Sequence, residues 1–128
     1  MSENREKALA HYRIERAQEL IEVSERLLEE GYLKDSINRS YYAIFDTLRA
    51  QLALEGFDSK KHSGIIAEFQ KLYIKTGVYP KEFSDYIKSA FEIRSRSDYD
   101  DMYIATRIEA ETQIEHAKAL VAAIEIHL

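Results

Sequence analysis

The sequence predicts an all-α protein, an antiparallel up-and-down helical bundle of about five helices. The chain of 128 residues contains only 4 glycines and 1 proline, and so few breakers favour long helices over a β-sandwich or barrel. Apolar residues recur at steps of three and four, which places them on one face of each helix. Each helix must bury that face, and short connections favour antiparallel neighbours.

The glycines and the proline mark where the expected helices begin and end. Gly31 is a natural stop for the first helix, and Asp35 is a candidate N-cap for the second. Ser59 is of a capping type, and Pro80 can open the fourth helix because its missing N–H is not needed there. The expected helices span about 4–30, about 35–55, Ser59 to Gly77, Pro80 onward and about 103–127.

Composition limits the class of protein further. The length suits one domain spanning residues 1–128. A net charge of −5 argues against duplex DNA as a partner, although a local basic pocket remains compatible with it. No apolar run approaches the roughly 20 residues of a membrane helix. The chain has no cysteine and a polar start without the apolar centre of a signal peptide. We therefore expect a cytoplasmic protein that binds no membrane.

Arg94 is unusual because it lies on the apolar stripe of the fourth helix. The stripe that begins at Phe83 and Ile87 places Arg94 near its middle. An unpaired buried charge is costly, and Asp98 lies one turn further along, where it can pair with this arginine. Two interpretations remain open: a structural ion pair or a snorkelling side chain, and an arginine held at a cleft for phosphate or carboxylate.

A second polar set lies on the side of the second helix opposite its apolar stripe, namely Arg39, Tyr42 and Asp46. Alanines on the same side would let another helix approach closely. We favour a central helix that contacts neighbours on two sides, or a dimer seam, over a pocket at this place. Such a contact would bring the three polar residues beside a helix interface.

The histidines do not indicate a metal site. No histidine follows a glutamate at the Glu-x-x-His spacing of di-metal bundles, and His-Glu-x-x-His is absent as well. Glycine-rich phosphate loops are also missing, so we expect no metal and no cofactor. His62 is in the first turn of the third helix, where we expect a capping or polar contact in preference to catalysis.

Three segments resemble parts of prokaryotic HEPN domains. Residues 38–45 (NRSYYAIF) look like their Arg-x-Tyr-Tyr-Ala-x-Phe segment. Residues 61–65 (KHSGI), followed by Phe69, are similar to the histidine-containing start of their third helix. Residues 94–99 (RSRSDY) look like the Arg-x-x-x-Asp-Tyr end of their fourth helix. The segments occur in the expected order, and with the helical pattern the resemblance covers nearly the whole chain.

The resemblance implies an antiparallel bundle, often a homodimer, that acts beside a minimal nucleotidyltransferase in toxin–antitoxin-like pairs. Active relatives cut RNA without metal, using an arginine followed a few residues later by a histidine. Arg94 matches that arginine, but Tyr99, Asp100 and Asp101 stand where the histidine is expected. Tyrosine has a pKa near 10 and is a poor proton shuttle at neutral pH. We therefore lean away from an enzyme.

Three functions remain as hypotheses. The first is a non-catalytic nucleotide- or partner-binding module. The second is a metal-independent endoribonuclease with substituted catalytic groups acting on RNA. The third is an oligomeric scaffold, which predicts no nucleotide-dependent rise in melting temperature. The candidate cleft residues are Arg94, Asp98, Tyr99, Arg39, Tyr42, Asp46 and His62.

Overall fold

The computed structural model describes residues 2–128, and it is built from helices. Five α-helices and one π-helical turn follow one another, and no strand occurs within this range. None of the described helices combines the length and apolar character of a membrane span. The elements are α1 (Ser2–Glu29), α2 (Leu33–Ala53), α3 (His62–Phe69), η1 (Gln70–Ile74), α4 (Glu82–Tyr99) and α5 (Arg107–Glu125).

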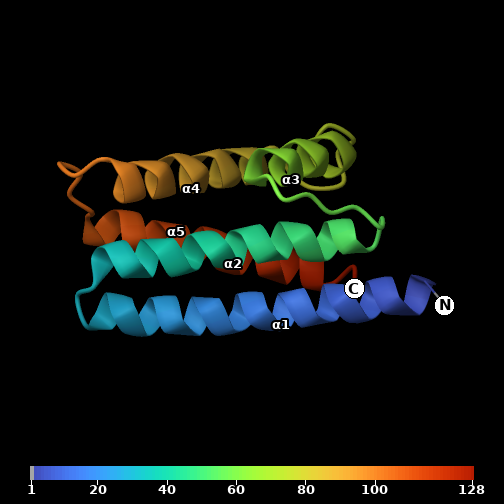
Figure 1. Ribbon diagram of the computed structural model, residues 1–128, viewed down its shortest axis with the longest axis horizontal. Helices are drawn as coiled ribbons and strands as arrows, with labels where there is room; N and C mark the ends of the chain where they lie inside the picture. Colours follow the sequence, from blue (N-terminus) through green and yellow to red (C-terminus); the bar gives the residue numbers. More distant parts are fainter. Residues whose placement is uncertain (1) are drawn as a thin grey trace.

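α2 is the central helix of the bundle. α1 and α2 form an antiparallel hairpin, α5 packs against both of them, and α3 and α4 cover the side of α2 away from α1 (Figure 1). The core is continuous through these elements and includes Leu48, Phe69 and Leu120. The predicted all-α antiparallel bundle is therefore confirmed, as is the central position of the second helix between neighbours on two sides.

The segment 54–61 departs from a simple up-and-down path. After α2 ends, this segment turns back along α2 before α3 begins (Figure 1). Asp58 contacts Arg49, and His62 then packs against Phe45 one turn earlier on α2. α3 consequently begins beside the middle of α2. This reversal brings the first turn of α3 close to the tyrosines of α2.

Small residues repeat along the seam between α1 and α2. The Ser24 hydroxyl donates to the Ser36 carbonyl at 2.7 Å, and the Ser36 hydroxyl donates to the Ser24 carbonyl at 2.8 Å. Because this pair fixes the antiparallel register, a step of two turns along each helix places Ala17 opposite Ala43. Both alanines are fully buried. The two helices therefore pack closely along small side chains.

Several predicted helix starts are wrong by a few residues. α2 begins at Leu33, so Asp35 lies in its first turn and is not the N-cap. α3 begins at His62, because the Ser59 hydroxyl accepts the Lys61 N–H and closes a turn before the helix. α5 begins at Arg107, after a capping box between Thr106 and Glu109. The expected start near residue 103 overlooked this cap.

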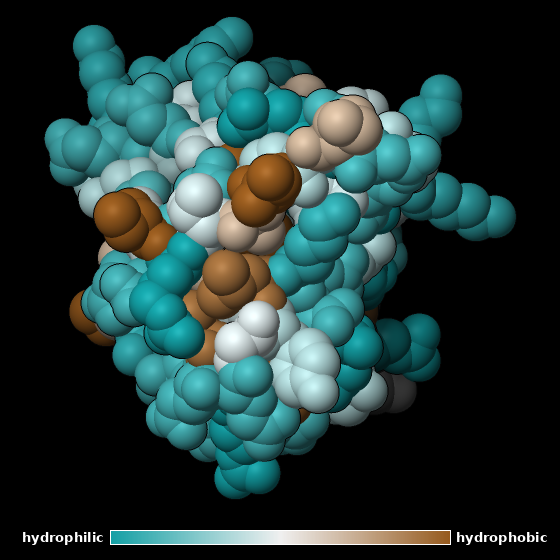
Figure 2. All heavy atoms as spheres, turned by 90° about the vertical axis from the view of Figure 1, so that its left-hand side faces the viewer, coloured by the Kyte–Doolittle hydropathy of each residue, from teal (hydrophilic) through white to brown (hydrophobic). Residues whose placement is uncertain are grey.

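The α4–α5 loop and the α1–α2 turn meet at one end of the molecule. Figure 2 shows that apolar side chains gather on this end. They include three of the most exposed large hydrophobic residues among those described, Met102, Ile104 and Ile108. α4 extends through Tyr99 toward this end, so the polar stretch at 95–99 is helical and Asp98 shares a helix with Arg94.

Candidate functional site

Arg94 leans from α4 onto α2 and is largely enclosed. Its side chain is 19% exposed. Nη2 donates a hydrogen bond to the Tyr42 hydroxyl at 3.2 Å. Nε lies 2.8 Å from Asp98 Oδ2, but its N–H is not aligned with that oxygen and makes no hydrogen bond. The contact with Asp98 is therefore a charge pairing within one helix, and Tyr42 is the hydrogen-bonded partner.

Two tyrosines of α2 flank the guanidinium. The Arg94 Cζ lies 5.3 Å from the centre of the Tyr41 ring and 5.7 Å from that of Tyr42. Both distances are within the range of cation–π attraction. Such contacts hold the guanidinium in place without using its N–H groups. Nη1 makes no hydrogen bond to any residue that the structure describes, so it is left for another acceptor.

His62 is positioned by aromatic neighbours on α2. Its Nδ1 lies 2.8 Å from the Tyr41 hydroxyl, and its ring centre lies 4.1 Å from that of Phe45. Burial lowers the pKa of His62, and the positive charges of Arg94 and Arg49 lower it further. Burial raises the pKa of Tyr41 to about 12, although Arg94 opposes this shift. Both side chains are therefore uncharged at neutral pH.

A cavity of about 490 Å³ opens beside Arg94, between α2 and the facing sides of α3 and α4. We refer to it as the Arg94 cavity. Two positively charged side chains, Arg94 and Lys61, reach it from different elements. Lys61 is exposed and forms no ion pair within the described residues. The lining residues are Tyr42, Lys61, His62, Ser63, Phe91, Arg94, Ser95 and Tyr99.

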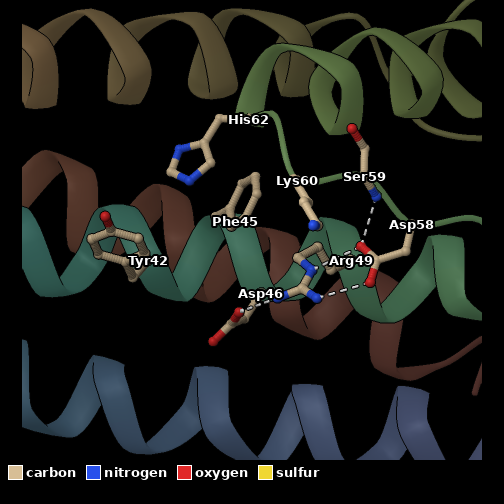
Figure 3. Close-up of a pocket in the computed structure, with 8 residues that line it drawn as sticks. All are labelled: Tyr42, Phe45, Asp46, Arg49, Asp58, Ser59, Lys60 and His62. Atoms are coloured by element: carbon tan, nitrogen blue, oxygen red, sulfur yellow. Dashed lines mark hydrogen bonds and ion pairs between the residues drawn. The ribbon is translucent and has the colours of Figure 1, made fainter.

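A second cavity of about 600 Å³ lies on the other side of Tyr42 and His62. Figure 3 shows its lining, with Asp58 of the returning segment facing Arg49 of α2. The Asp58 carboxylate accepts from Arg49 at 3.1 Å and from the buried Arg13 at 3.2 Å. We call this space the Arg49 cavity. Its lining residues are Tyr42, Phe45, Asp46, Arg49, Asp58, Ser59, Lys60 and His62.

Asp46 belongs to the Arg49 cavity and points away from His62 (Figure 3). Burial raises the pKa of its carboxyl group, and the nearby Arg49, Arg16 and Arg13 only partly oppose this shift. Its nearest cation is the Arg49 guanidinium, at 4.0 Å. Asp46 therefore belongs to the Arg49 cavity and does not line the Arg94 cavity.

The residues predicted for the cleft have separate positions. Tyr42, His62, Arg94 and Tyr99 line the Arg94 cavity, and Asp98 pairs with Arg94 from the same helix. Asp46 lies in the adjoining cavity. Arg39 is exposed on α2 and lines neither space. Four of the seven candidates therefore converge on one cavity, and a fifth touches its arginine.

Sequence reasoning missed several residues that line these cavities, including Arg49, Lys61, Asp58 and Phe91. Arg49 follows Tyr42 by seven residues, so helical spacing alone could have placed it on the same face. Lys61 lies directly beside His62 in the chain, so its closeness to a candidate residue was the available signal. Asp58 gave no signal, because its position depends on the reversed path of 54–61. Phe91 is apolar and follows the buried stripe of the fourth helix, so nothing in the sequence indicated that it would be 39% exposed.

The fold and the cavities define a class of protein: an all-α bundle with an arginine, two tyrosines and a histidine clustered between its second, third and fourth helices. The chain belongs to the HEPN domain family, whose model matches residues 10–127. The resemblance drawn from the three segments is therefore confirmed.

Several curated proteins and one solved structure are similar to this chain. A UPF0332 protein of Thermotoga maritima is 32% identical over 94% of this chain and 91% of that protein. "Putative toxin MJ0142" of Methanocaldococcus jannaschii is 35% identical over 77% of this chain and 67% of that protein. The crystal structure of TT1696 from Thermus thermophilus superposes with a TM-score of 0.79 at 19% identity, covering 93% of this chain and 98% of that one. The last similarity shows the shared fold.

Proposed function

We propose that this chain is a non-catalytic, nucleotide-binding HEPN module that pairs with a minimal nucleotidyltransferase in a toxin–antitoxin-like system. The observation that carries the nucleotide-binding part is Arg94, whose guanidinium is held by tyrosines while Nη1 has no hydrogen-bond partner among residues 2–128. A guanidinium fixed in this way is suited to a phosphate oxygen, because little side-chain entropy is lost on binding.

Two further groups support a phosphate at the same place. The Lys61 ammonium lines the Arg94 cavity and has no carboxylate partner in the described chain. α3 begins at His62 without a side-chain cap. Its first N–H groups therefore add partial positive charge beside this lysine. Asp98 pairs with Arg94, so Lys61 and the first turn of α3 supply the positive charge that is not compensated here, in contrast to the net charge of −5 on the whole chain. An anion would therefore be attracted to this cavity in particular.

The pairing with a nucleotidyltransferase rests on kinship. Two relatives of Methanocaldococcus jannaschii, at 35% and 31% identity, are named as putative toxins. Co-expression of this chain with a small nucleotidyltransferase encoded next to its gene would test the pairing. Co-purification at a fixed ratio is expected, and two proteins that elute separately would contradict this part of the proposal.

Nucleotide binding is tested by replacing Arg94 with alanine. Loss of a charge-assisted hydrogen bond should weaken the binding of adenosine 5′-monophosphate by about tenfold or more, measured by isothermal titration calorimetry. Arg96→Ala is the matched control, because Arg96 is an exposed arginine on the same helix that stacks on Tyr103. Equal affinities in the two variants, or an unfolded Arg94→Ala protein in circular dichroism, would make Arg94 a structural residue.

One observation favours a second candidate function, a metal-independent endoribonuclease with substituted groups. His62 is uncharged, is held by Tyr41 and lines the same cavity as Arg94. An imidazole in this state can act as a general base. Purified protein incubated with single-stranded RNA and a chelator would decide the question. Cleavage that disappears in His62→Asn would support the enzyme, and intact RNA at high protein concentration would exclude it.

A further inference from the structure

A third cavity, of about 350 Å³, continues the Arg94 cavity along the groove between α3 and α4. Ser63 and Phe91 line both spaces, so the two form one groove. Its far end is formed mainly by the apolar side chains of Ile66, Ala67 and Phe91, with Lys88 at the rim. The groove is therefore cationic at the Arg94 end and apolar at the other.

Phe91 is the aromatic surface of this groove. Its neighbour Ala90 is 1% exposed and packs in the core, whereas Phe91 is 39% exposed. The helical turn of α4 thus directs this phenyl ring out of the core and into the groove. Across from it, α3 presents the small and exposed side chain of Ala67. This pairing of an aromatic ring with an alanine leaves room for a flat group.

We propose that the apolar end of this groove is the subsite for the base of a nucleoside 5′-monophosphate whose phosphate lies at Arg94. The proposal rests on the nucleotide-binding function proposed above and adds where the base binds. A base has an aromatic face that can stack on Phe91. It also has polar edges that the Lys88 ammonium at the rim can meet. Ser63, which lines both parts of the groove, lies where the ribose would pass.

Three ligands of increasing size separate the two ends of the groove. Inorganic phosphate and ribose 5-phosphate need only the Arg94 end, whereas adenosine 5′-monophosphate also occupies the apolar end. Calorimetric titration should give a dissociation constant for the nucleotide about tenfold below that for ribose 5-phosphate, as expected for one stacked base. Similar affinities for these two ligands in the wild-type protein would overturn the proposal.

Two substitutions test the apolar end without touching Arg94. Phe91→Ala removes the stacking face, and Ala67→Leu fills the space opposite it. Each should raise the dissociation constant for the nucleotide about tenfold, to that of ribose 5-phosphate. Ala67 lines only the apolar end, so Ala67→Leu should also leave the affinity for ribose 5-phosphate unchanged. Tyr12→Ala is the control, because Tyr12 is an exposed aromatic residue on α1, which lies on the other side of α2 (Figure 1).

The outcomes distinguish the two proposals. If both variants lose the preference for the nucleotide and the control keeps it, the base subsite is supported. If the preference survives both substitutions, the base binds elsewhere and the subsite is refuted, while phosphate binding at Arg94 stands. If ribose 5-phosphate does not bind the wild-type protein at all, the proposed function fails and the subsite fails with it.

Discussion

The two sides of α2 differ in how they meet their neighbours. Toward α1, the seam consists of serine and alanine pairs without exposed surface, such as Ser24 with Ser36. Toward α3 and α4, the same helix presents the large side chains of Tyr42, Phe45 and Arg49, which line cavities of about 490 and 600 Å³. We call these sides the closed face and the open face of α2.

The difference shows where a small bundle can carry a site. Small side chains let two backbones approach closely and exclude any ligand. Long aromatic and cationic side chains keep neighbouring helices apart, and the remaining space is reachable from solvent. A single helix can therefore stabilise the fold with one face and form a binding cavity with the other.

The closed face should not tolerate a larger side chain. Ala50 is fully buried, and the register of the seam places it opposite Ala10. Ala50→Leu should lower the free energy of unfolding by about 3 kcal/mol, because the overpacked helices must separate. Ala67→Leu is the same substitution on the open side and should change stability by less than about 0.5 kcal/mol. Urea unfolding followed by circular dichroism measures both, and equal losses would contradict the division.

Asp58 holds segment 54–61 against α1 and α2 through Arg13 and Arg49. These ion pairs should contribute less to the stability of the protein than the closed face does, but more than an ordinary surface charge. Partial burial opposes ionisation of Asp58, but hydrogen bonds from Arg49 and the Ser59 N–H outweigh it and lower its pKa. Asp58→Asn would leave the buried Arg13 without its counter-charge.

We expect Asp58→Asn to lower the free energy of unfolding by about 1–2 kcal/mol, by analogy with other partly buried charged hydrogen bonds. Asp101→Asn, at an exposed loop position, is the matched control and should have almost no effect. Urea unfolding at neutral pH gives both values. If the ion pairs of Asp58 contribute nothing, the two variants will have identical urea midpoints of unfolding.

The sequence determined more of the closed face than of the open one. Apolar periodicity and rare breakers were enough for the helices, because these patterns act within single elements. Arg94 was found as a candidate because it interrupts an apolar stripe, and Tyr42 because it belongs to a polar set opposite the stripe of the second helix. The hydrogen bond between Arg94 and Tyr42 could not be predicted. It depends on how α4 is turned about its own axis against α2, and on α4 continuing as a helix through Asp98. Phe91 is exposed although Ala90 beside it is buried, because successive residues of an α-helix point about 100° apart, and the sequence does not show which of the two faces the core.

The paths of the loops were the other feature that could not be predicted from the sequence. Segment 54–61 contains no regular pattern, and its reversal along α2 depends on Asp58 meeting cations from two other helices. Such long-range ion pairs leave no signal in a single sequence. The position of His62 beside Tyr41 follows from this reversal. Sequence reasoning could therefore suggest a polar contact and a place in the cleft for His62, but not its partner.

The smallest expected effect is the pH dependence that His62 gives to the open face. Its pKa is lowered in the folded protein by burial and by the charges of Arg94 and Arg49. Near its unfolded value of about 6.5, the unfolded chain therefore binds more protons than the folded one. The stability from the uncharged imidazole is fully present above that pH and is lost as the pH falls through the folded pKa.

Replacing His62 with glutamine should therefore make the decline in stability between pH 7 and pH 5 shallower. Other titrating groups, including Asp46, are present in both proteins, so the difference between the two curves isolates His62. If a phosphate binds at Arg94, its negative charge offsets the nearby cations that lower the pKa of His62. Saturating ribose 5-phosphate should then also reduce the loss of stability of the wild-type protein between pH 7 and pH 5. The same ligand should have no such effect in Arg94→Ala. Parallel curves of stability against pH for the wild type and His62→Gln would show that this imidazole is as accessible to water in the folded protein as in the unfolded chain. The open face would then be too solvated to hold the imidazole uncharged.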